Sequence, residues 1–158
     1  MAGNGLIYTA SFTGSTLPNA ATGIWEITAA AGVPILIHSI RVTFTPTITS
    51  GVAQDVRLSL ISTRMSAAGS GGTAATPRAI NSRNTVAAAG TYTGMQTTPG
   101  TATNTLDAEI VSVIVPFERI FTPDQRIVIP GGTFWSLKLT AGGGQTFVTS
   151  SEIYVEEI

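Results

Sequence analysis

Apolar and polar residues alternate with a period of two along much of this chain, which is the pattern of a β-strand with one buried face. The clearest case is residues 33–45, where β-branched residues dominate. One set of alternate residues is predicted to form the core face of this strand: Leu36, His38, Ile40, Val42 and Phe44. Helical spacing fits this stretch less well, so we predict a strand.

Further segments of the chain carry strand-like sequence, and Gly- and Pro-containing turns separate most of them. These segments are residues 6–12, 22–28, 55–62, 108–117, 126–129, 133–140 and 145–158. Residues 108–117 are apolar on both faces, so we expect that strand to be covered on both sides. The sequence therefore predicts an all-β domain spanning residues 1–158, a jelly-roll-like sandwich or barrel of about eight antiparallel strands.

Residues 64–106 interrupt this pattern, because no apolar period of 2 or 3.6 continues through them. Compact domains usually join neighbouring elements with a few residues, so a connection of this length is disordered or held by something else. We predict one long loop that meets a partner. Residues 1–5 carry no charged side chain and are mostly small. We expect them to form a flexible N-terminal arm that a neighbour could order.

The predicted loop or its start contains Arg64, Arg78 and Arg83. Arginine forms planar, bidentate pairs with carboxylates and is enriched at interfaces, although three solvated charges are an equally plain interpretation. Tyr92 and Met95 are the large apolar residues deep in the loop, and they could insert into a partner's pocket. We therefore predict these five residues as the partner-binding set.

The composition favours contact with other proteins. Only 11% of the residues are charged, against about 25% in average soluble proteins. A surface so poor in charge suits a protein that lies against other copies or another surface. With a pI of 5.7 and no basic cluster, binding to nucleic acid is not expected. We also see no signal peptide and no membrane-spanning run, so we expect synthesis as a soluble chain in a cytoplasm.

Few residues could carry catalysis or bind a metal. Cysteine is absent, and the single histidine, His38, is predicted to be a core residue bonded to a backbone carbonyl. Asp107 and Glu109 share strand parity, but a solvated acidic edge is favoured over the two-carboxylate site of a glycosidase. Trp25 and Trp135 are predicted to pack in the core rather than to stack on sugars. We expect no enzymatic activity, no cofactor and no metal.

Four stretches together resemble small structural proteins of tailed bacteriophages, including capsid decoration or cement proteins. They are VRLSLISTR, AAGSGGTAATPRAINSRN, VPFERIFTPDQRIVIPGGTFWSLKLTAGGGQTF and SEIYVEE, within a match that covers most of the chain from about Ile40 onward. The resemblance implies a jelly-roll or related β-barrel subunit, often trimeric, that binds the outer surface of the capsid. Such proteins have no active site and hold capsid subunits together against the internal pressure of the DNA.

The leading hypothesis is a capsid decoration protein on the virion surface. Its partners would be the major capsid protein and further copies of itself in a homotrimer, contacted through the N-terminal arm and the 64–106 loop. A second hypothesis is a receptor- or carbohydrate-binding module of a phage head fibre or tail. A third is a carboxylate hydrolase that uses Asp107 and Glu109.

Overall fold

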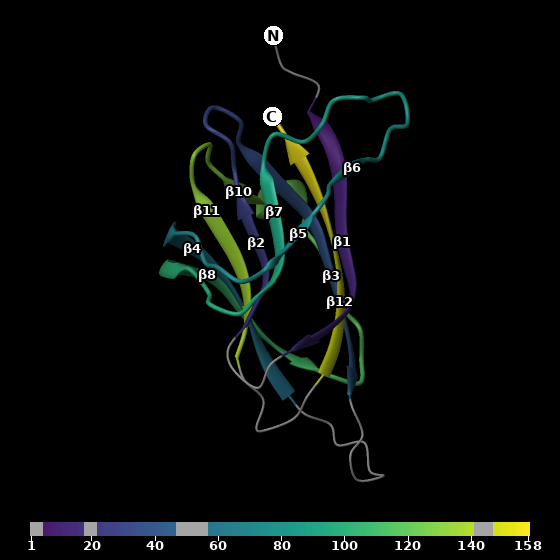
Figure 1. The fold of residues 1–158 in the computed structure, drawn as a ribbon, viewed down its shortest axis with the longest axis vertical. Coiled ribbons are helices and arrows are strands. Elements are labelled where there is room, and N and C mark those ends of the chain that lie inside the picture. Colours follow the sequence, from purple (N-terminus) through teal and green to yellow (C-terminus); the bar gives the residue numbers. More distant parts are fainter. Residues whose placement is uncertain (1–4, 18–21, 47–56, 141–146) are drawn as a thin grey trace.

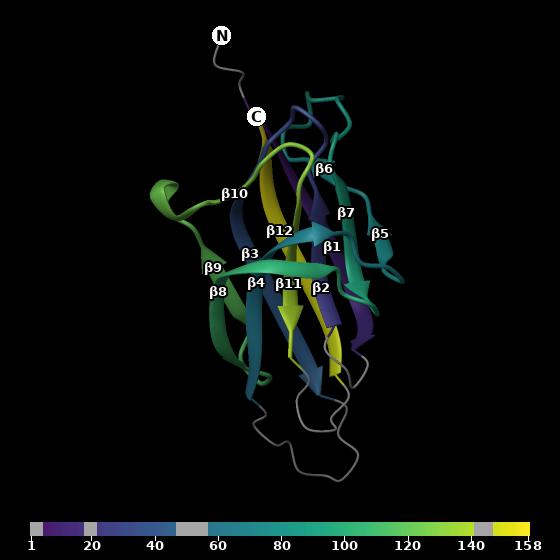
Figure 2. The same cartoon turned by 90° about the vertical axis from the view of Figure 1, so that its left-hand side faces the viewer.

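Two antiparallel β-sheets pack face to face in this protein (Figures 1 and 2). The computed structural model describes residues 5–17, 22–46, 57–140 and 147–158. Within them the one short helix is the 3-10 turn η1 (Pro123–Gln125), and the remaining regular structure is β. The predicted all-β sandwich is confirmed, and the sheets do not close into a barrel. Residues 1–4 of the predicted arm, 55–56 and 145–146 lie outside the described residues.

Each sheet has six strands. Sheet A consists of β10 (Ile127–Ile129), β3 (Ile35–Pro46), β12 (Phe147–Glu157), β1 (Leu6–Leu17) and β6 (Arg78–Ala79) in this order, with β9 (Phe117–Ile120) also paired to β3. Sheet B consists of β5 (Thr73–Ala75), β7 (Thr91–Gln96), β2 (Thr22–Thr28), β11 (Phe134–Leu139), β4 (Arg57–Ala67) and β8 (Thr101–Ser112) in this order.

The pairing of the long strands is nested. The first strand pairs with the last (β1 with β12), β2 pairs with β11, β3 pairs with β9 and β10, and β4 pairs with β8. This order, split over two sheets, is that of a jelly roll. Periodicity alone predicts the strands but not this order, which depends on contacts between residues far apart in the sequence.

The core lies between the two sheets and contains both tryptophans, as predicted. Trp25 on β2 donates a hydrogen bond from Nε1 to Ser151 Oγ at 2.8 Å, and Trp135 on β11 donates one to Ser62 Oγ at 2.8 Å. Because each indole N–H finds a hydroxyl, the rings are buried without an unsatisfied donor.

The predicted core face of β3 is correct only from Ile40 onward. In the pairing with β12, Tyr154 lies opposite Ser39 and Val155 lies opposite Ile37, so His38 is the extra residue of a β-bulge. The bulge reverses the alternation, because one extra residue moves every preceding side chain to the other face.

His38 consequently points out of the sandwich, and the prediction of a core histidine is wrong. Its side chain is 23% exposed, and Nε2 lies 2.9 Å from Glu156 Oε2. The partner is a carboxylate rather than a backbone carbonyl. Ile35 and Ile37 take the buried positions that the sequence pattern gave to Leu36 and His38.

The prediction of one long loop over residues 64–106 is also wrong. The segment contains the end of β4, three short strands and the first half of β8. We call the connection between β4 and β8, residues 68–100, the insertion. Its strand β7 extends sheet B beside β2, and β6 extends sheet A beside β1. These strands escaped prediction because hydrophobic alternation reports burial, and residues 101–106 pair with β4 while remaining exposed.

Candidate functional site

The insertion is held in place by side chains of its own subunit. Glu157 at the end of β12 accepts hydrogen bonds from the backbone N–H groups of Ala89 and Gly90, both at 2.9 Å, and from the Tyr92 hydroxyl at 3.2 Å. The Tyr8 hydroxyl on β1 donates to the carbonyl oxygen of Val86 at 3.2 Å. The far part of the insertion is thus ordered without a partner.

The two ends of the insertion fold over the outer face of sheet B. In Figure 2 the end of β4 and the start of β8 cross in front of β11 and β2. Irregularities in the β4–β8 pairing accompany this bend, the first between Ser62 and Thr63. We call this folded part, residues 66–72 and 97–103, the ribbon. It explains why polar residues such as Gln96 and Ser136 are buried on that face.

One acidic and one basic side chain of sheet B hold the ribbon. Both Glu26 carboxylate oxygens accept from the Gly69 N–H, at 3.0 and 2.9 Å, and Lys138 Nζ donates to the Gly100 carbonyl at 2.9 Å. Burial lowers the pKa of Lys138, while the nearby Glu26 charge acts in the opposite direction. A Cβ atom at Gly100 would lie 2.2 Å from the Ala67 carbonyl oxygen, so the close approach requires glycine.

Tyr92 and Met95 do not face a partner, and their prediction as anchors is wrong. Both side chains belong to the core, with exposed fractions of 1% and 9%. Because β7 joins sheet B, its large apolar residues fill the sandwich of their own subunit. Burial, reinforced by the charge of Glu157, raises the pKa of Tyr92 above its ordinary range.

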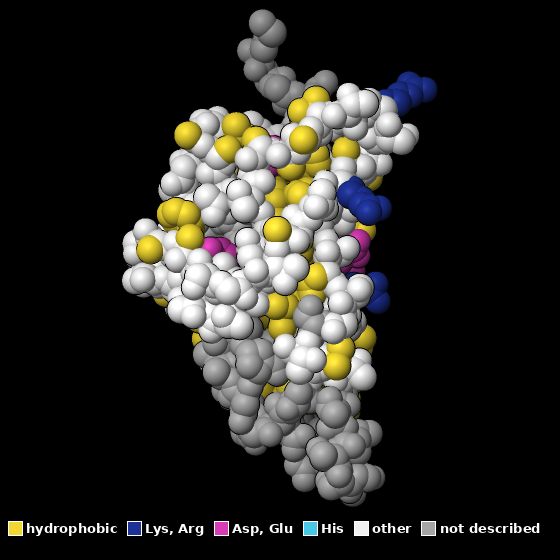
Figure 3. Space-filling view, in the orientation of Figure 1, with side chains coloured by type: hydrophobic (Ala, Val, Ile, Leu, Met, Phe, Trp, Pro, Cys, Tyr) yellow, Lys and Arg dark blue, Asp and Glu magenta, His cyan; other side chains and the backbone are white. Residues whose placement is uncertain are grey.

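Arg78 and Arg83 lie exposed on the insertion, so their predicted role in binding a partner stays a prediction. The chain around Arg83 is ordered by two asparagines. Asn81 Oδ1 accepts from the Arg83 N–H, and Asn84 Oδ1 accepts from the Val86 N–H, both at 3.0 Å. Figure 3 shows that charged side chains are sparse over this face of the molecule.

Arg64 lies apart from the other two predicted arginines, on the opposite edge of the sandwich. It borders an open groove of about 330 Å³ between β4 and β8 of one sheet and β9 and β10 of the other. We call it the arginine groove. Its lining consists of Arg64, Leu106, Asp107, Arg119, Phe121, Gln125, Arg126, Ile127 and Val128.

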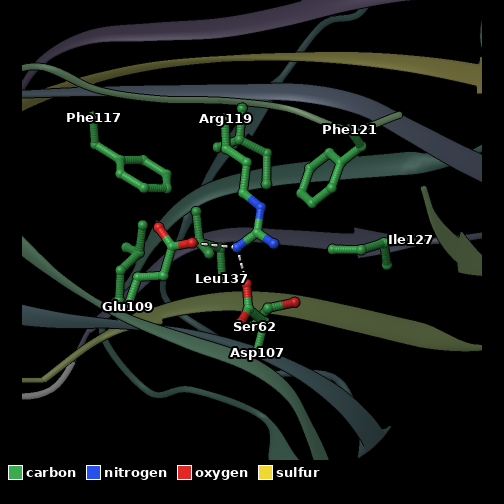
Figure 4. A pocket seen from close by; sticks show the side chains of 10 residues that line it. Ser62, Asp107, Glu109, Phe117, Arg119, Phe121, Ile127 and Leu137 are labelled. Carbon is green, nitrogen blue, oxygen red and sulfur yellow. Dashed lines mark hydrogen bonds and ion pairs between the residues drawn. The ribbon is translucent and has the colours of Figure 1, made fainter. Parts of the chain in front are cut away.

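Arg119 lines this groove and also a small neighbouring cavity, which Figure 4 shows. Its Nη1 makes ion pairs with Asp107 and Glu109, and its guanidinium lies over the Phe121 ring, 5.1 Å from the centroid. The carboxylates come from β8 in sheet B and the arginine from β9 in sheet A, so the cluster joins the two sheet edges.

The predicted carboxylate pair is therefore brought together, but both members bind one arginine. The cavity beside the cluster measures about 20 Å³, enough for about one water molecule and too small for a sugar ring. The geometry of this cavity offers no support for a glycosidase-type site.

The other two arginines of the groove lack such partners. Within the described part of the chain, neither Arg64 nor Arg126 has a carboxylate in ion-pair contact, and the buried Nε of Arg126 has no hydrogen-bond acceptor. A guanidinium with an unsatisfied buried donor is uncommon in a folded protein.

Exposed aliphatic side chains lie on the strands that border the groove and in the turn between β8 and β9. Ile110 on β8 is 74% exposed and Ile120 on β9 is 73% exposed. The others are Leu106, Ile114, Val115 and Val128. Among the described strands, β8 pairs only with β4, and β9 and β10 pair only with β3. We call these three strands with their exposed aliphatic residues the open edge; Figure 2 shows β9 and β10 on the left and the insertion strands on the right.

The open edge also overturns the expectation that residues 108–117 form a strand covered on both sides. The strand β8 ends at Ser112, and the chain turns before β9 begins at Phe117. Ile110, Ile114 and Val115 are exposed rather than buried. Apolar residues on both faces of a central strand indicate that both faces are buried. On the edge strand β8 they do not, because Ile110 is exposed.

Several further candidates find no support in the described residues. Both tryptophans are buried, and the large hydrophobic side chains that are fully exposed there are all aliphatic, so neither tryptophan supports a sugar-binding site. The same residues contain no group of three His, Asp or Glu side chains that could hold a metal ion. Nor do they contain a helix with the length and apolarity needed to cross a bilayer.

The sequence pattern did not predict four of these residues: Glu26, Glu157, Arg119 and Arg126. A signal was present for Arg119, which alternates with Phe117 and Phe121 and so had to share their face. Glu26 stands in a strand of otherwise apolar or small residues, which is a weaker signal of a buried carboxylate. Nothing local distinguishes Glu157 from Glu156, because its role depends on the distant insertion.

No protein-family model, no curated protein and no solved structure matches this chain.

Proposed function

We propose that the protein is a non-catalytic structural subunit of a tailed-bacteriophage virion, which binds the outside of the capsid and stabilises the shell. The observation that carries this proposal is the open edge. Natural β-proteins usually protect their edge strands, because unpaired N–H and C=O groups beside exposed apolar residues invite pairing with another chain. Here such an edge borders an arginine-lined groove, which favours a protein partner.

Adhesion at two separate places gives such a subunit its mechanism. The open edge and the insertion strands, of which β6 begins at the exposed Arg78, lie on opposite sides of the sandwich (Figure 2). A rigid body with two contact sites can join two neighbouring major capsid proteins. Several weak contacts then act together, since the second contact forms at a high effective concentration once the first is made.

Binding to capsids that lack this protein tests the proposal. The purified protein is added to such capsids, which are then sedimented and assayed for bound protein. Wild-type protein should bind, whereas Ile110→Asp/Ile120→Asp should bind at least about tenfold more weakly, because two charges must be desolvated in the contact. Thr16→Asp/Thr45→Asp, which adds the same charges at exposed positions of β1 and β3, should bind like wild type.

Two results would reject the proposal. The first is wild-type protein that stays in the supernatant at every concentration tested. The second is equal binding by both double variants, which would remove the open edge as the contact surface. Circular dichroism of each variant separates lost binding from lost folding.

A further inference from the structure

The charges that line the arginine groove do not balance. Asp107 and Glu109 are both engaged with Arg119. This leaves Arg64 and Arg126 facing the same groove with no described carboxylate in contact. Two like charges beside one groove repel each other, and a carboxylate placed between them would relieve this repulsion.

Arg126 provides a second, independent sign of a missing partner. Its Nε is buried and donates to no acceptor in the described part of the protein. Leaving a buried donor unsatisfied costs free energy, which Arg126 recovers when its side chain turns Nε toward an acceptor bound in the groove. A guanidinium presents its donors in a planar fork that matches a carboxylate, so the expected ligand group is a carboxylate.

The shape and the rest of the lining indicate a peptide rather than a small anion. The groove has a volume of about 330 Å³ and includes the apolar side chains of Leu106, Phe121, Ile127 and Val128. An inorganic anion would leave these apolar groups uncovered. The groove also lies between β8 and β10, and each of these strands has an unpaired side among the described strands. An extended segment could therefore add to a sheet edge.

We infer that the arginine groove is the docking site for an extended acidic segment of a partner protein. An acidic side chain of that segment binds Arg64 and Arg126, and an aliphatic side chain packs against Phe121 and Ile127. Neighbouring side chains of an extended peptide point to opposite faces, so groove-facing residues alternate with residues outside it. The inference adds a docking site to the proposed function. It rests on that function only in identifying the partner as the capsid protein.

The insertion segment of a second copy of this chain would fit the arginine groove poorly. Residues 65–106 contain no Asp and no Glu, and they bring two further arginines, Arg78 and Arg83. Placing that segment in the arginine groove would add positive charge where negative charge is needed. The charge pattern thus favours an acidic segment over the insertion of a second copy.

Selection from a display library of random linear peptides tests the inference. Peptides selected on the full-length protein should be rich in Asp and Glu with aliphatic residues between them. Arg64→Gln/Arg126→Gln should weaken their binding at least about tenfold, because charge-assisted hydrogen bonds are lost. Arg78→Gln/Arg83→Gln removes the same charge from the insertion and should bind the peptides like wild type.

Four outcomes would overturn the inference: no enrichment of peptides, enrichment without an acidic excess, equal binding by the two variants, or full displacement of the peptides by sulfate at low concentration. A fifth would be a wild-type oligomer that becomes a monomer only in Arg64→Gln/Arg126→Gln, which would make a second copy the occupant.

The peptide assay and the capsid assay distinguish the two proposals. In one outcome, acidic peptides bind through Arg64 and Arg126 but the wild-type protein does not bind capsids. This result would support the docking site and reject the proposed function. In the other outcome, Arg64→Gln/Arg126→Gln binds capsids as well as wild type does. This result would support the proposed function and reject the docking site.

Discussion

Two buried carboxylates determine the path of a large part of this chain. Glu26 and Glu157 lie in the interior, where an ionised group without partners would be strongly unfavourable. Each instead accepts hydrogen bonds from backbone N–H groups of the insertion, at Gly69 for Glu26 and at Ala89 and Gly90 for Glu157. The insertion in turn depends on them, because those N–H groups have no strand partner.

Replacing Glu157 tests this dependence. Glu157→Gln keeps the shape but replaces one acceptor oxygen by a donor, which opposes an N–H or O–H donor of the insertion. We expect the free energy of unfolding to fall by about 1–3 kcal/mol, measured by urea denaturation. Glu118→Gln, at an exposed position of β9, should change it by less than about 0.5 kcal/mol. Equal effects of the two changes would contradict the role given to Glu157.

Tyr92 makes stability depend on alkaline pH. Its pKa is raised above the ordinary value of 10.0 in the folded protein. Below pH 10 the hydroxyl is neutral in both states. Above pH 10 the unfolded chain releases the proton while the folded protein retains it, so the free energy of unfolding falls by about 1.4 kcal/mol per pH unit.

The variant Tyr92→Phe removes this titration. It should be less stable than wild type at pH 8, because the hydrogen bond to Glu157 is lost. The difference should shrink steadily above pH 10, as measured by urea denaturation across the pH range. Tyr154, whose pKa is raised chiefly by Glu152, titrates in both proteins and cancels in the comparison. A difference that stays constant with pH would contradict this prediction.

At the residue scale the sequence predicted burial better than contact. Trp25 and Trp135 were assigned to the core from alternation alone, and both are there. His38 was misplaced by a single bulge, since a period-two pattern does not record where an extra residue enters a strand. Tyr92 and Met95 are large apolar residues in polar surroundings, and a sequence alone does not tell whether such residues face a partner or their own core.

Among the elements, the ribbon places the most demanding constraint on sequence. Its two sides lie so close that a Cβ atom at Gly100 would meet the Ala67 carbonyl oxygen and the Gly69 nitrogen. Those neighbours are backbone atoms and cannot rotate away. The ribbon in turn covers the polar outer face of sheet B, so its path determines whether Glu26, Gln96 and Ser136 are buried.

The change Gly100→Ala should therefore displace the ribbon. We expect a loss of about 1–3 kcal/mol in unfolding free energy, as for other overpacked sites. Hydrogen exchange should also become faster in β2 and β11, whose outer faces the ribbon covers. Thr101→Ala, at the next and exposed position, serves as the control. Slow exchange in β2 and β11 of Gly100→Ala would show that the ribbon tolerates the extra carbon.

The strands fall into two groups by how far the sequence predicts them. The strands of the sandwich carry apolar alternation because burial on one face selects it. β5, β6, β7 and the first half of β8 carry little or none, because hydrogen bonds to a neighbouring strand hold them. The arginine groove was beyond prediction for a related reason: it joins side chains from four strands and a turn, and the sequence does not give their order.

The two sides of the whole molecule differ in how their sheet edges are covered. The insertion extends both sheets beside β1 and β2, whereas the opposite side ends in strands with free edges and exposed aliphatic residues. Only 11% of the residues are charged, so little electrostatic repulsion keeps copies apart. These properties support the proposal that the protein assembles with itself.

The proposed homotrimer predicts a definite mass. Native mass spectrometry of the purified protein should give three times the chain mass of 16.3 kDa. Ile110→Asp/Ile120→Asp reports whether the open edge contributes to this assembly, and Thr16→Asp/Thr45→Asp is again the control. A wild-type protein that remains at the chain mass at all concentrations would reject the trimer while leaving capsid binding by a monomer possible.

The pairing of β1 with β12 runs along the whole length of both strands, from Leu6 opposite Glu157 to Leu17 opposite Phe147. Sheet A therefore lacks its central strand, β12, until the ribosome has added all the residues between Leu17 and Glu157, which takes on the order of ten seconds at typical elongation rates. During that time the newly made β1 and β3 expose their apolar faces. Nascent chains should accordingly recruit chaperones, and sheet A should form only after β12 has left the ribosome.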